Sequence, residues 1–271
     1  MNNLVKRAIT GTIYVLSVIA AVFIHPIVTA VYFLIVAMLG LREFYSVSGK
    51  KDISVNRIAA LGLGFVAYAC VLLVSKAQYQ TAEIVICFLT AFILFLFINE
   101  LYRKNKNPFT NIAYTVTGVV YVVLPLALTN VIINFNGVYS PMILMSVFIF
   151  AWCNDTFAYL TGMKLGKHKL FERISPKKTW EGWVGGFLFT IIAAVIISSC
   201  SDVLKTGDFI AIAIITSVIG TFGDLVESMF KRQMEVKDSG NILPGHGGIL
   251  DRFDILLLVL PAVWCYLLIR F

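Results

Sequence analysis

Long apolar stretches alternate with short polar connections along almost the whole chain. The stretches are continuous and lack the period-two alternation that is typical of a half-buried strand. A hydrocarbon core about 30 Å thick needs roughly 20 mainly apolar residues per helix, and open sheet edges cannot be satisfied in lipid. The pattern therefore predicts an all-α polytopic membrane protein with about nine transmembrane helices. The nine stretches are residues 5–24, 27–42, 57–75, 82–99, 110–133, 141–161, 181–200, 208–230 and 250–269.

The composition agrees with a membrane protein. Of the 271 residues, 59% are hydrophobic and only 14% are charged, whereas a soluble domain is about 25% charged. We find no internal repeat, low-complexity tract or linker. We therefore expect one integral membrane domain over residues 1–271, with N-terminal helices in 1–135 and the helices and loops that could carry catalysis in 141–271.

The distribution of basic residues predicts how the chain is oriented. If the N-terminus is cytoplasmic, 19 of the 22 lysines and arginines fall in segments on the inner side, and only Lys76, Lys205 and Arg270 fall outside. An excess of Lys and Arg marks cytoplasmic loops. The pattern therefore favours a cytoplasmic N-terminus, an external C-terminus and polar loops after residue 150 that face the cytoplasm.

Acidic residues enter the later apolar stretches. Asp155 lies inside the stretch 141–161. Asp224 and Glu227 lie three residues apart in 208–230, and Asp251 and Asp254 lie at the start of 250–269. Residues three apart share a helix face, and ionisable groups in spans usually face a partner or a water-filled cavity. Two acid pairs near one membrane surface indicate a site for a divalent cation, and Mg²⁺ prefers carboxylates, water and phosphate oxygens.

A structural explanation of the same acids stays open. Lys231, Arg232 and Arg252 lie close to the acid pairs in sequence, so intramembrane ion pairs would also neutralise them.

A lysine-rich loop precedes the acid pairs. In SPKKT, Ser175-Pro176 favours a turn, Lys177 and Lys178 supply point charges suited to phosphate, and Thr179 is placed to cap the following helix. A basic patch on the membrane surface is the alternative for the two lysines.

Glycines occur in two contexts with different meanings. Gly182 and Gly186 form a GxxxG spacing that favours close helix packing. In the segment PGHGG, Gly247 and Gly248 would let backbone N–H groups approach an anion, and His246 is a candidate general base or hydrogen-bond donor to phosphate.

One long motif resembles a known signature. SMFKRQMEVKDSGNILPGHGGILDRFD, residues 228–254, is similar to the signature of the phosphatidate cytidylyltransferases, also called CDP-diacylglycerol synthases. NDTFAY at 154–159, SPKKTWEG at 175–182 and GDLVES at 223–228 resemble secondary motifs of that family. The resemblance is strong in the C-terminal half and rests only on hydropathy in the N-terminal half. The matching positions are Ser228, Lys231, Arg232, Lys237, Asp238, Gly240, Leu243, Pro244, His246, Gly247, Gly248, Asp251, Arg252 and Asp254.

The resemblance implies an integral enzyme that condenses CTP with phosphatidate to give CDP-diacylglycerol and diphosphate. It implies a nine-helix homodimer. Together with the charge distribution, it leads us to expect a multi-pass protein of the cell (inner) membrane whose active site faces the cytoplasm, and we expect no nucleic-acid partner. It also implies Mg²⁺, with a second, monovalent cation such as K⁺, near Asp224 and Asp251.

Each candidate residue receives an expected role from this resemblance and from its chemistry. Asp224 and Asp251 are the first candidates for metal ligands, followed by Glu227. The cations expected to neutralise the triphosphate and the leaving diphosphate are Lys177, Lys178, Lys231, Arg232 and Lys237. The groups expected to orient substrate or ligands are Glu227, Asp238, His246 and Asp254. The remaining candidates for substrate binding are Asp155, Ser175, Ser228, Gly247, Gly248 and Arg252.

Two other functions stay open. A CTP-dependent polyprenol kinase would share the membrane setting, but it would release CDP and a phosphorylated alcohol. A secondary transporter is disfavoured, because the charges gather at one face and the two halves lack matched broken helices.

Overall fold

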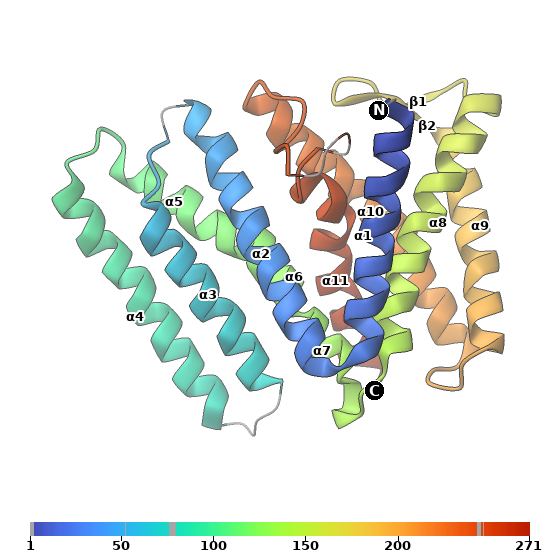
Figure 1. Ribbon diagram of the computed structural model, residues 1–271, viewed down its shortest axis with the longest axis horizontal. Helices are drawn as coiled ribbons and strands as arrows, with labels where there is room; N and C mark the ends of the chain where they lie inside the picture. The colour runs from blue at the N-terminus through green and yellow to red at the C-terminus, as the bar shows by residue number, and fades with distance from the viewer. Residues whose placement is uncertain (1–2, 52, 76–79, 243–244, 246) are drawn as a thin grey trace.

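The computed structural model describes residues 3–51, 53–75, 80–242, 245 and 247–271, most of them in helices that run side by side (Figure 1). The long helices are α1 (Asn3–Ile24), α2 (Pro26–Ser48), α3 (Arg57–Val74), α4 (Gln80–Arg103), α8 (Pro141–Leu165), α9 (Trp180–Ser199), α10 (Thr206–Gln233) and α11 (Leu250–Arg270). The short elements are η1 (Gly49–Lys51), α5 (Pro108–Gly118), η2 (Val119–Val123), α6 (Leu124–Ala127), α7 (Thr129–Ile133), η3 (Phe135–Gly137), β1 (Lys169–Phe171) and β2 (Ser175–Thr179).

The all-α, polytopic membrane class is confirmed. In the described part of the chain, eight helical segments are long and apolar enough to cross a membrane. The first predicted stretch is also helical, but its apolar part, Ala8–Ile24, is shorter than the other eight. By length and composition, the described residues therefore contain eight candidate spans, with α1 as a further, shorter apolar helix. The N- and C-termini lie at opposite ends of the helices (Figure 1).

The predicted helix over residues 110–133 is not a single helix. It consists of α5, the π-helical η2, α6 and α7 in succession. Pro125 lies at the start of α6, where its missing N–H removes one bond of the helical ladder. Local π-helix frequently marks functional or strained segments. The apolar pattern identified the span but not the interruption.

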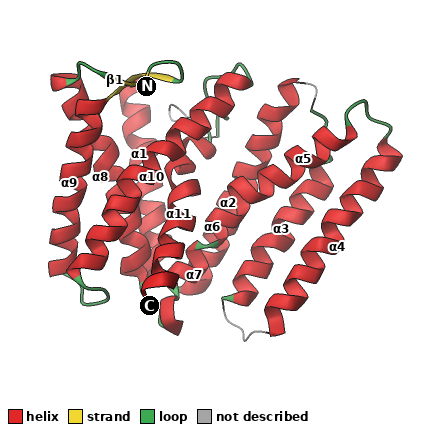
Figure 2. Ribbon diagram, turned by 180° about the vertical axis from the view of Figure 1, so that it is seen from behind, coloured by secondary structure: helices red, strands yellow, loops and turns green. Residues whose placement is uncertain are grey.

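A small hairpin covers one end of the helices (Figure 2). Strands β1 and β2 pair antiparallel, with Lys169 opposite Thr179 and Phe171 opposite Ser175. The expected turn at Ser175-Pro176 is therefore wrong, because Ser175 begins β2. Proline is tolerated there because a two-stranded ribbon has two edge strands, and an edge position needs no N–H donor.

The predicted cap at the end of this hairpin is confirmed. The Thr179 Oγ1 atom accepts a hydrogen bond of 3.2 Å from the N–H of Gly182, which satisfies one of the free donors in the first turn of α9. The cap fixes the direction in which β2 enters α9.

Aromatic side chains join the N-terminal helices to those that carry the predicted site. Phe33 of α2 lies 6.0 Å from Phe148 of α8, and Tyr14 of α1 lies 5.6 Å from Phe253 of α11, between ring centroids. Phe33, Phe148 and Phe253 are fully buried. The Tyr14–Phe253 pair is edge-to-face and the Phe33–Phe148 pair is tilted, and such aromatic contacts add to the burial of large apolar surfaces. The first two helices therefore pack directly on α8 and α11.

Small residues bring α9 close to α8. A Cβ added at Gly182 would lie 2.7 Å from the carbonyl oxygen of Ala158, and one at Gly186 would lie 2.6 Å from that of Asn154. The packing role predicted for this GxxxG pair is confirmed. The Asn154 Oδ1 atom also accepts a 2.6 Å hydrogen bond from Ser217 Oγ of α10. These contacts hold α8, α9 and α10 together below the hairpin.

Candidate active site

A pocket opens where α8, β2, α9 and α10 meet. Its volume is about 420 Å³. Acidic and basic groups lie on its wall beside apolar side chains, so it can accept a ligand with a phosphate group and an apolar portion. The lining includes Asp155, Lys177, Lys178, Thr179, Thr221 and Asp224, together with Met163, Leu170 and Trp183.

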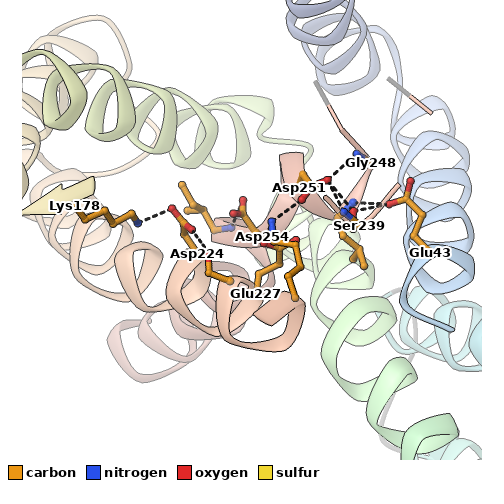
Figure 3. Close-up of polar contacts among 12 residues, drawn as sticks. Glu43, Lys178, Asp224, Glu227, Ser239, Gly248, Asp251 and Asp254 are labelled. Carbon is orange, nitrogen blue, oxygen red and sulfur yellow. Dashed lines mark hydrogen bonds and ion pairs between the residues drawn. The ribbon is translucent and has the colours of Figure 1, made fainter. Parts of the chain in front are cut away.

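An ion pair joins two of the predicted site residues at this pocket. Lys178 Nζ lies 2.5 Å from Asp224 Oδ2, and the two side chains are 28% and 27% exposed (Figure 3). Ser228 Oγ donates to the other oxygen, Asp224 Oδ1, at 3.2 Å. Both charges can still be reached by a ligand, because neither side chain is fully buried. The hairpin thus brings SPKKT onto the same surface as the acids of α10.

A second lysine lies between two buried carboxylates. Lys231 pairs with Glu227 one turn earlier in α10 and lies 2.6 Å from Asp251 Oδ1 in α11. The side chains of Glu227 and Asp251 are 1% and 6% exposed, and that of Lys231 is 13% exposed. This arrangement is the intramembrane ion pairing that the sequence left open for Lys231. It links the two helices at the level of the acid pairs.

The other oxygen of Asp251 organises the connection between α10 and α11. Asp251 Oδ2 lies within hydrogen-bond distance of the N–H of Gly248 at 2.7 Å, the N–H of Ser239 at 2.9 Å and the Ser239 hydroxyl at 3.0 Å. Gly247 has φ +82°, a conformation that favours glycine, and a Cβ there would meet the same oxygen. The buried N–H of Gly248, which the sequence suggested for anion binding, therefore already donates to the Asp251 carboxylate.

The predicted metal ligands do not meet directly. Figure 3 shows the labelled side chains in a row from Lys178 to Glu43, with Asp254 and Glu227 between Asp224 and Asp251. Asp254 lies within electrostatic range of Asp155, Asp224 and Glu227. The structure thus brings the acids of α8, α10 and α11 into one cluster, in which Asp224 pairs with Lys178 and Asp251 pairs with Lys231.

The other predicted residues differ in how they relate to the pocket. Arg232, Lys237, Asp238 and Arg252 are exposed, and Ser175 lies at the start of β2. Lys177 reaches the pocket from the same strand. His246, like Leu243 and Pro244 of the motif, lies outside the described residues.

The chemistry of the cluster fits a hard cation. The cluster holds five carboxylates, Asp155, Asp224, Glu227, Asp251 and Asp254. Four cations lie beside them, Lys177, Lys178, Lys231 and Arg252, which leaves an excess of one formal negative charge. Glu227 Oε1 is buried and has no hydrogen-bond partner among the described residues. In that same part of the chain, no three acids, histidines or cysteines are already gathered around one point that would hold a metal ion.

Two contributors were not identified from the sequence. Ser239 contacts both Asp251 and Glu43, and Glu43 reaches the α10–α11 connection from α2. An acid at the end of an apolar stretch is ordinary, so Glu43 gave no distinctive signal. The long motif includes Gly240, and the structure places this glycine against the Glu43 carboxylate.

Comparison with known proteins assigns the family. Residues 5–270 match the model of the Cytidylyltransferase family. The chain belongs to this family. Among similar members, a phosphatidate cytidylyltransferase of Staphylococcus haemolyticus is 33% identical over 263 residues, covering 95% of this chain and 96% of the relative. Those of Staphylococcus saprophyticus and Staphylococcus aureus are 32% and 33% identical over 264 and 267 residues, with the same coverage of both chains.

Membership of the Cytidylyltransferase family extends the resemblance found in the sequence. The motifs pointed to the C-terminal half, whereas the match also includes the helices before residue 135. The family resemblance is therefore confirmed for almost the full chain.

Proposed function

We propose that this chain is a phosphatidate cytidylyltransferase, which converts CTP and phosphatidate into CDP-diacylglycerol and diphosphate. The observation that carries the proposal is the 420 Å³ pocket with Lys177, Lys178 and Asp224 on its polar wall and apolar side chains beside them. Such a wall suits a reaction between two phosphate-bearing substrates, one of which brings apolar chains from the membrane. The relatives that bear this enzyme name support the same assignment.

The reaction needs no nucleophile from the protein. An oxygen of the phosphatidate phosphate attacks the α-phosphorus of CTP, a new P–O bond forms, and the bond from the α-phosphorus to the bridging oxygen breaks. Diphosphate leaves with that oxygen. Catalysis of such a step rests on positioning and on neutralisation of charge. Lys177 and Lys178 are placed to neutralise phosphate charge at the pocket, and Ser228 orients the carboxylate of Asp224.

We further propose that the acid cluster takes up Mg²⁺, together with a monovalent cation such as K⁺. Bound there, Mg²⁺ would supply charge neutralisation for the phosphates of CTP. Asp224 and Asp251 remain the proposed ligands, with Glu227 as a third candidate. The lysines that pair with these acids, Lys178 and Lys231, would exchange a carboxylate for a phosphate oxygen as substrate binds.

The orientation of the site is also a proposal. The bias of lysines and arginines supports a cytoplasmic N-terminus, and the hairpin lies at the same end of the helices as the N-terminus (Figure 1). CTP would then enter from the cytoplasm and phosphatidate sideways from the inner leaflet of the cell membrane. We propose a homodimer as the assembly, on the strength of the family resemblance.

The test is a product assay on purified protein with CTP, phosphatidate and Mg²⁺. We expect liponucleotide and diphosphate in equal amounts, and Asp224→Asn should lose this activity while remaining folded. Asp202→Asn is a matched control, because Asp202 is an exposed acid in the α9–α10 connection, at the far end from the hairpin. Release of CDP with a phosphorylated lipid alcohol would instead identify a polyprenol kinase, and solute flux in proteoliposomes without CTP turnover would identify a transporter.

A further inference from the structure

A glutamate of the N-terminal half lies buried against the connection between α10 and α11. Glu43 belongs to α2 and is only 5% exposed. Its Oε2 atom accepts a 3.0 Å hydrogen bond from the N–H of Leu250, the first residue of α11, and lies 3.1 Å from Ser239 Oγ. In the described part of the chain, no lysine or arginine pairs with it. The Glu43 carboxylate therefore binds the N–H of Leu250 and the hydroxyl of Ser239 and forms no ion pair with a lysine or arginine of the described residues.

The Ser239 hydroxyl connects Glu43 to the acid cluster. The same oxygen lies 3.1 Å from Glu43 Oε2 and 3.0 Å from Asp251 Oδ2 (Figure 3). A hydroxyl carries one proton, so it can donate to only one of these carboxylates at a time. Ser239 therefore lies between the two carboxylates, with its backbone N–H and its hydroxyl both within hydrogen-bond distance of Asp251.

Two glycines of the long motif make room for Glu43. If Gly240 carried a Cβ, its three nearest neighbours would all be atoms of the Glu43 side chain, and a Cβ at Gly248 would also collide with the carboxylate. Neither glycine has a positive φ. Their backbones could therefore carry alanine. The space for Glu43 requires glycine at 240, and the space for Glu43 and the Ser239 hydroxyl together requires it at 248.

Neighbouring contacts hold the end of α2 in the same place. Phe44 stacks on Phe230 of α10, with ring centroids 4.7 Å apart and planes at 10°. Lys51, just after α2, pairs with Glu235, just after α10. Three successive contacts therefore join the end of α2 to the end of α10 and to the connection that follows.

We propose that Glu43 is a positioning residue for cytidylyl transfer, acting through Ser239 and the start of α11 to set the orientation of Asp251. The inference rests on the proposed function. Glu43 is not among the side chains that line the pocket. Its loss is therefore expected to lower kcat and to leave the KM for CTP almost unchanged, whereas loss of a group that binds CTP would raise KM.

The experiment is a double-mutant cycle between Glu43→Ala and Gly240→Ala, with kcat, KM and the thermal unfolding temperature measured in detergent. Gly240→Ala alone should lower kcat by about 100-fold, the scale for a displacement of about 1 Å at a reacting group. In the Glu43→Ala background the same substitution should change kcat by less than about twofold, because its steric target is gone. Gly49→Ala is the matched control, since no atom lies within 4 Å of a Cβ at Gly49.

A conservative variant keeps the test decisive if Glu43→Ala fails to fold. Glu43→Gln retains an oxygen that can accept from Leu250 and Ser239, so it should keep more than about half of kcat. Equal losses from Gly240→Ala in both backgrounds, wild-type activity of Glu43→Ala, or an inactive but folded Glu43→Gln would each overturn the proposal. If the wild-type protein makes no CDP-diacylglycerol, the proposed function fails. The contact between residue 240 and Glu43 can then still be tested, because the effects of Glu43→Ala and Gly240→Ala on the unfolding temperature should be non-additive.

Discussion

Lys231 holds two buried carboxylates of different helices, and removing its charge should destabilise the protein. The substitution Lys231→Met keeps the length and the apolar stem of the side chain but leaves Glu227 and Asp251, which are 1% and 6% exposed, without their cation. Removing one partner of a buried ion pair costs about 3–5 kcal/mol. This cost corresponds to at least a 100-fold change in the unfolding equilibrium, at about 1.4 kcal/mol per factor of ten.

The assay is thermal unfolding in detergent, followed by intrinsic fluorescence. At about 2–4 °C per kcal/mol for chains of comparable size, Lys231→Met should lower the unfolding temperature by about 6–20 °C. The double variant Glu227→Gln/Lys231→Met should recover part of the loss, because one of the two unpaired carboxylates is gone. Lys205→Met is the control, since Lys205 is exposed just before α10, at the other end of that helix.

An unfolding temperature of Lys231→Met within about 2 °C of wild type, less than the shift for one kcal/mol, would refute this reasoning. So would a double variant that is no more stable than Lys231→Met alone. Either result would mean that the two carboxylates do not depend on Lys231 in the folded protein.

Three further predictions concern the site and its frame. Asp251→Asn should abolish CTP-dependent activity while the protein stays folded, because an amide nitrogen cannot accept the hydrogen bonds that the Asp251 carboxylate now accepts. Activity near wild type would contradict the role of Asp251. Chelation by EDTA should stop turnover, and added Mg²⁺ should restore it; turnover that persists in excess EDTA would exclude the proposed cation. Gly182→Ala should cost about 1–3 kcal/mol in detergent unfolding, because its Cβ would lie 2.7 Å from the Ala158 carbonyl oxygen; unchanged stability would show that α8 and α9 can separate without loss.

The sequence predicted the features that depend on nearby residues. Apolar stretches gave the membrane class because each span must satisfy its own backbone in lipid. Thr179 was identified as a cap, and Gly182 with Gly186 as a packing surface, because both features have a local signature. All three appear in the structure as expected.

Features that depend on distant partners were not predicted. Glu43 meets Ser239 across 196 residues of sequence, and nothing in the local pattern around either residue indicates the other. The interruption around Pro125 and the start of β2 at Ser175 depend on how neighbouring elements pack.

The acid cluster was predicted in its composition but not in its pairing. The sequence placed Asp224 and Asp251 on neighbouring helices, and it left open whether lysines or a cation would neutralise them. The structure pairs Asp224 with Lys178 and Asp251 with Lys231. Ion pairs with lysines and a bound cation would each neutralise the buried carboxylates, so residue spacing alone cannot distinguish the two arrangements.

The most direct test of cytidylyl transfer follows labelled phosphates of CTP. Purified protein is supplied with phosphatidate, Mg²⁺ and CTP that is labelled at either the α- or the γ-phosphate. We predict that the α-label enters the lipid fraction and the γ-label appears in diphosphate, and that Lys178→Met, which removes the cation beside Asp224, greatly slows both. Transfer of the γ-label to lipid, with the α-label left in CDP, would contradict the proposed function.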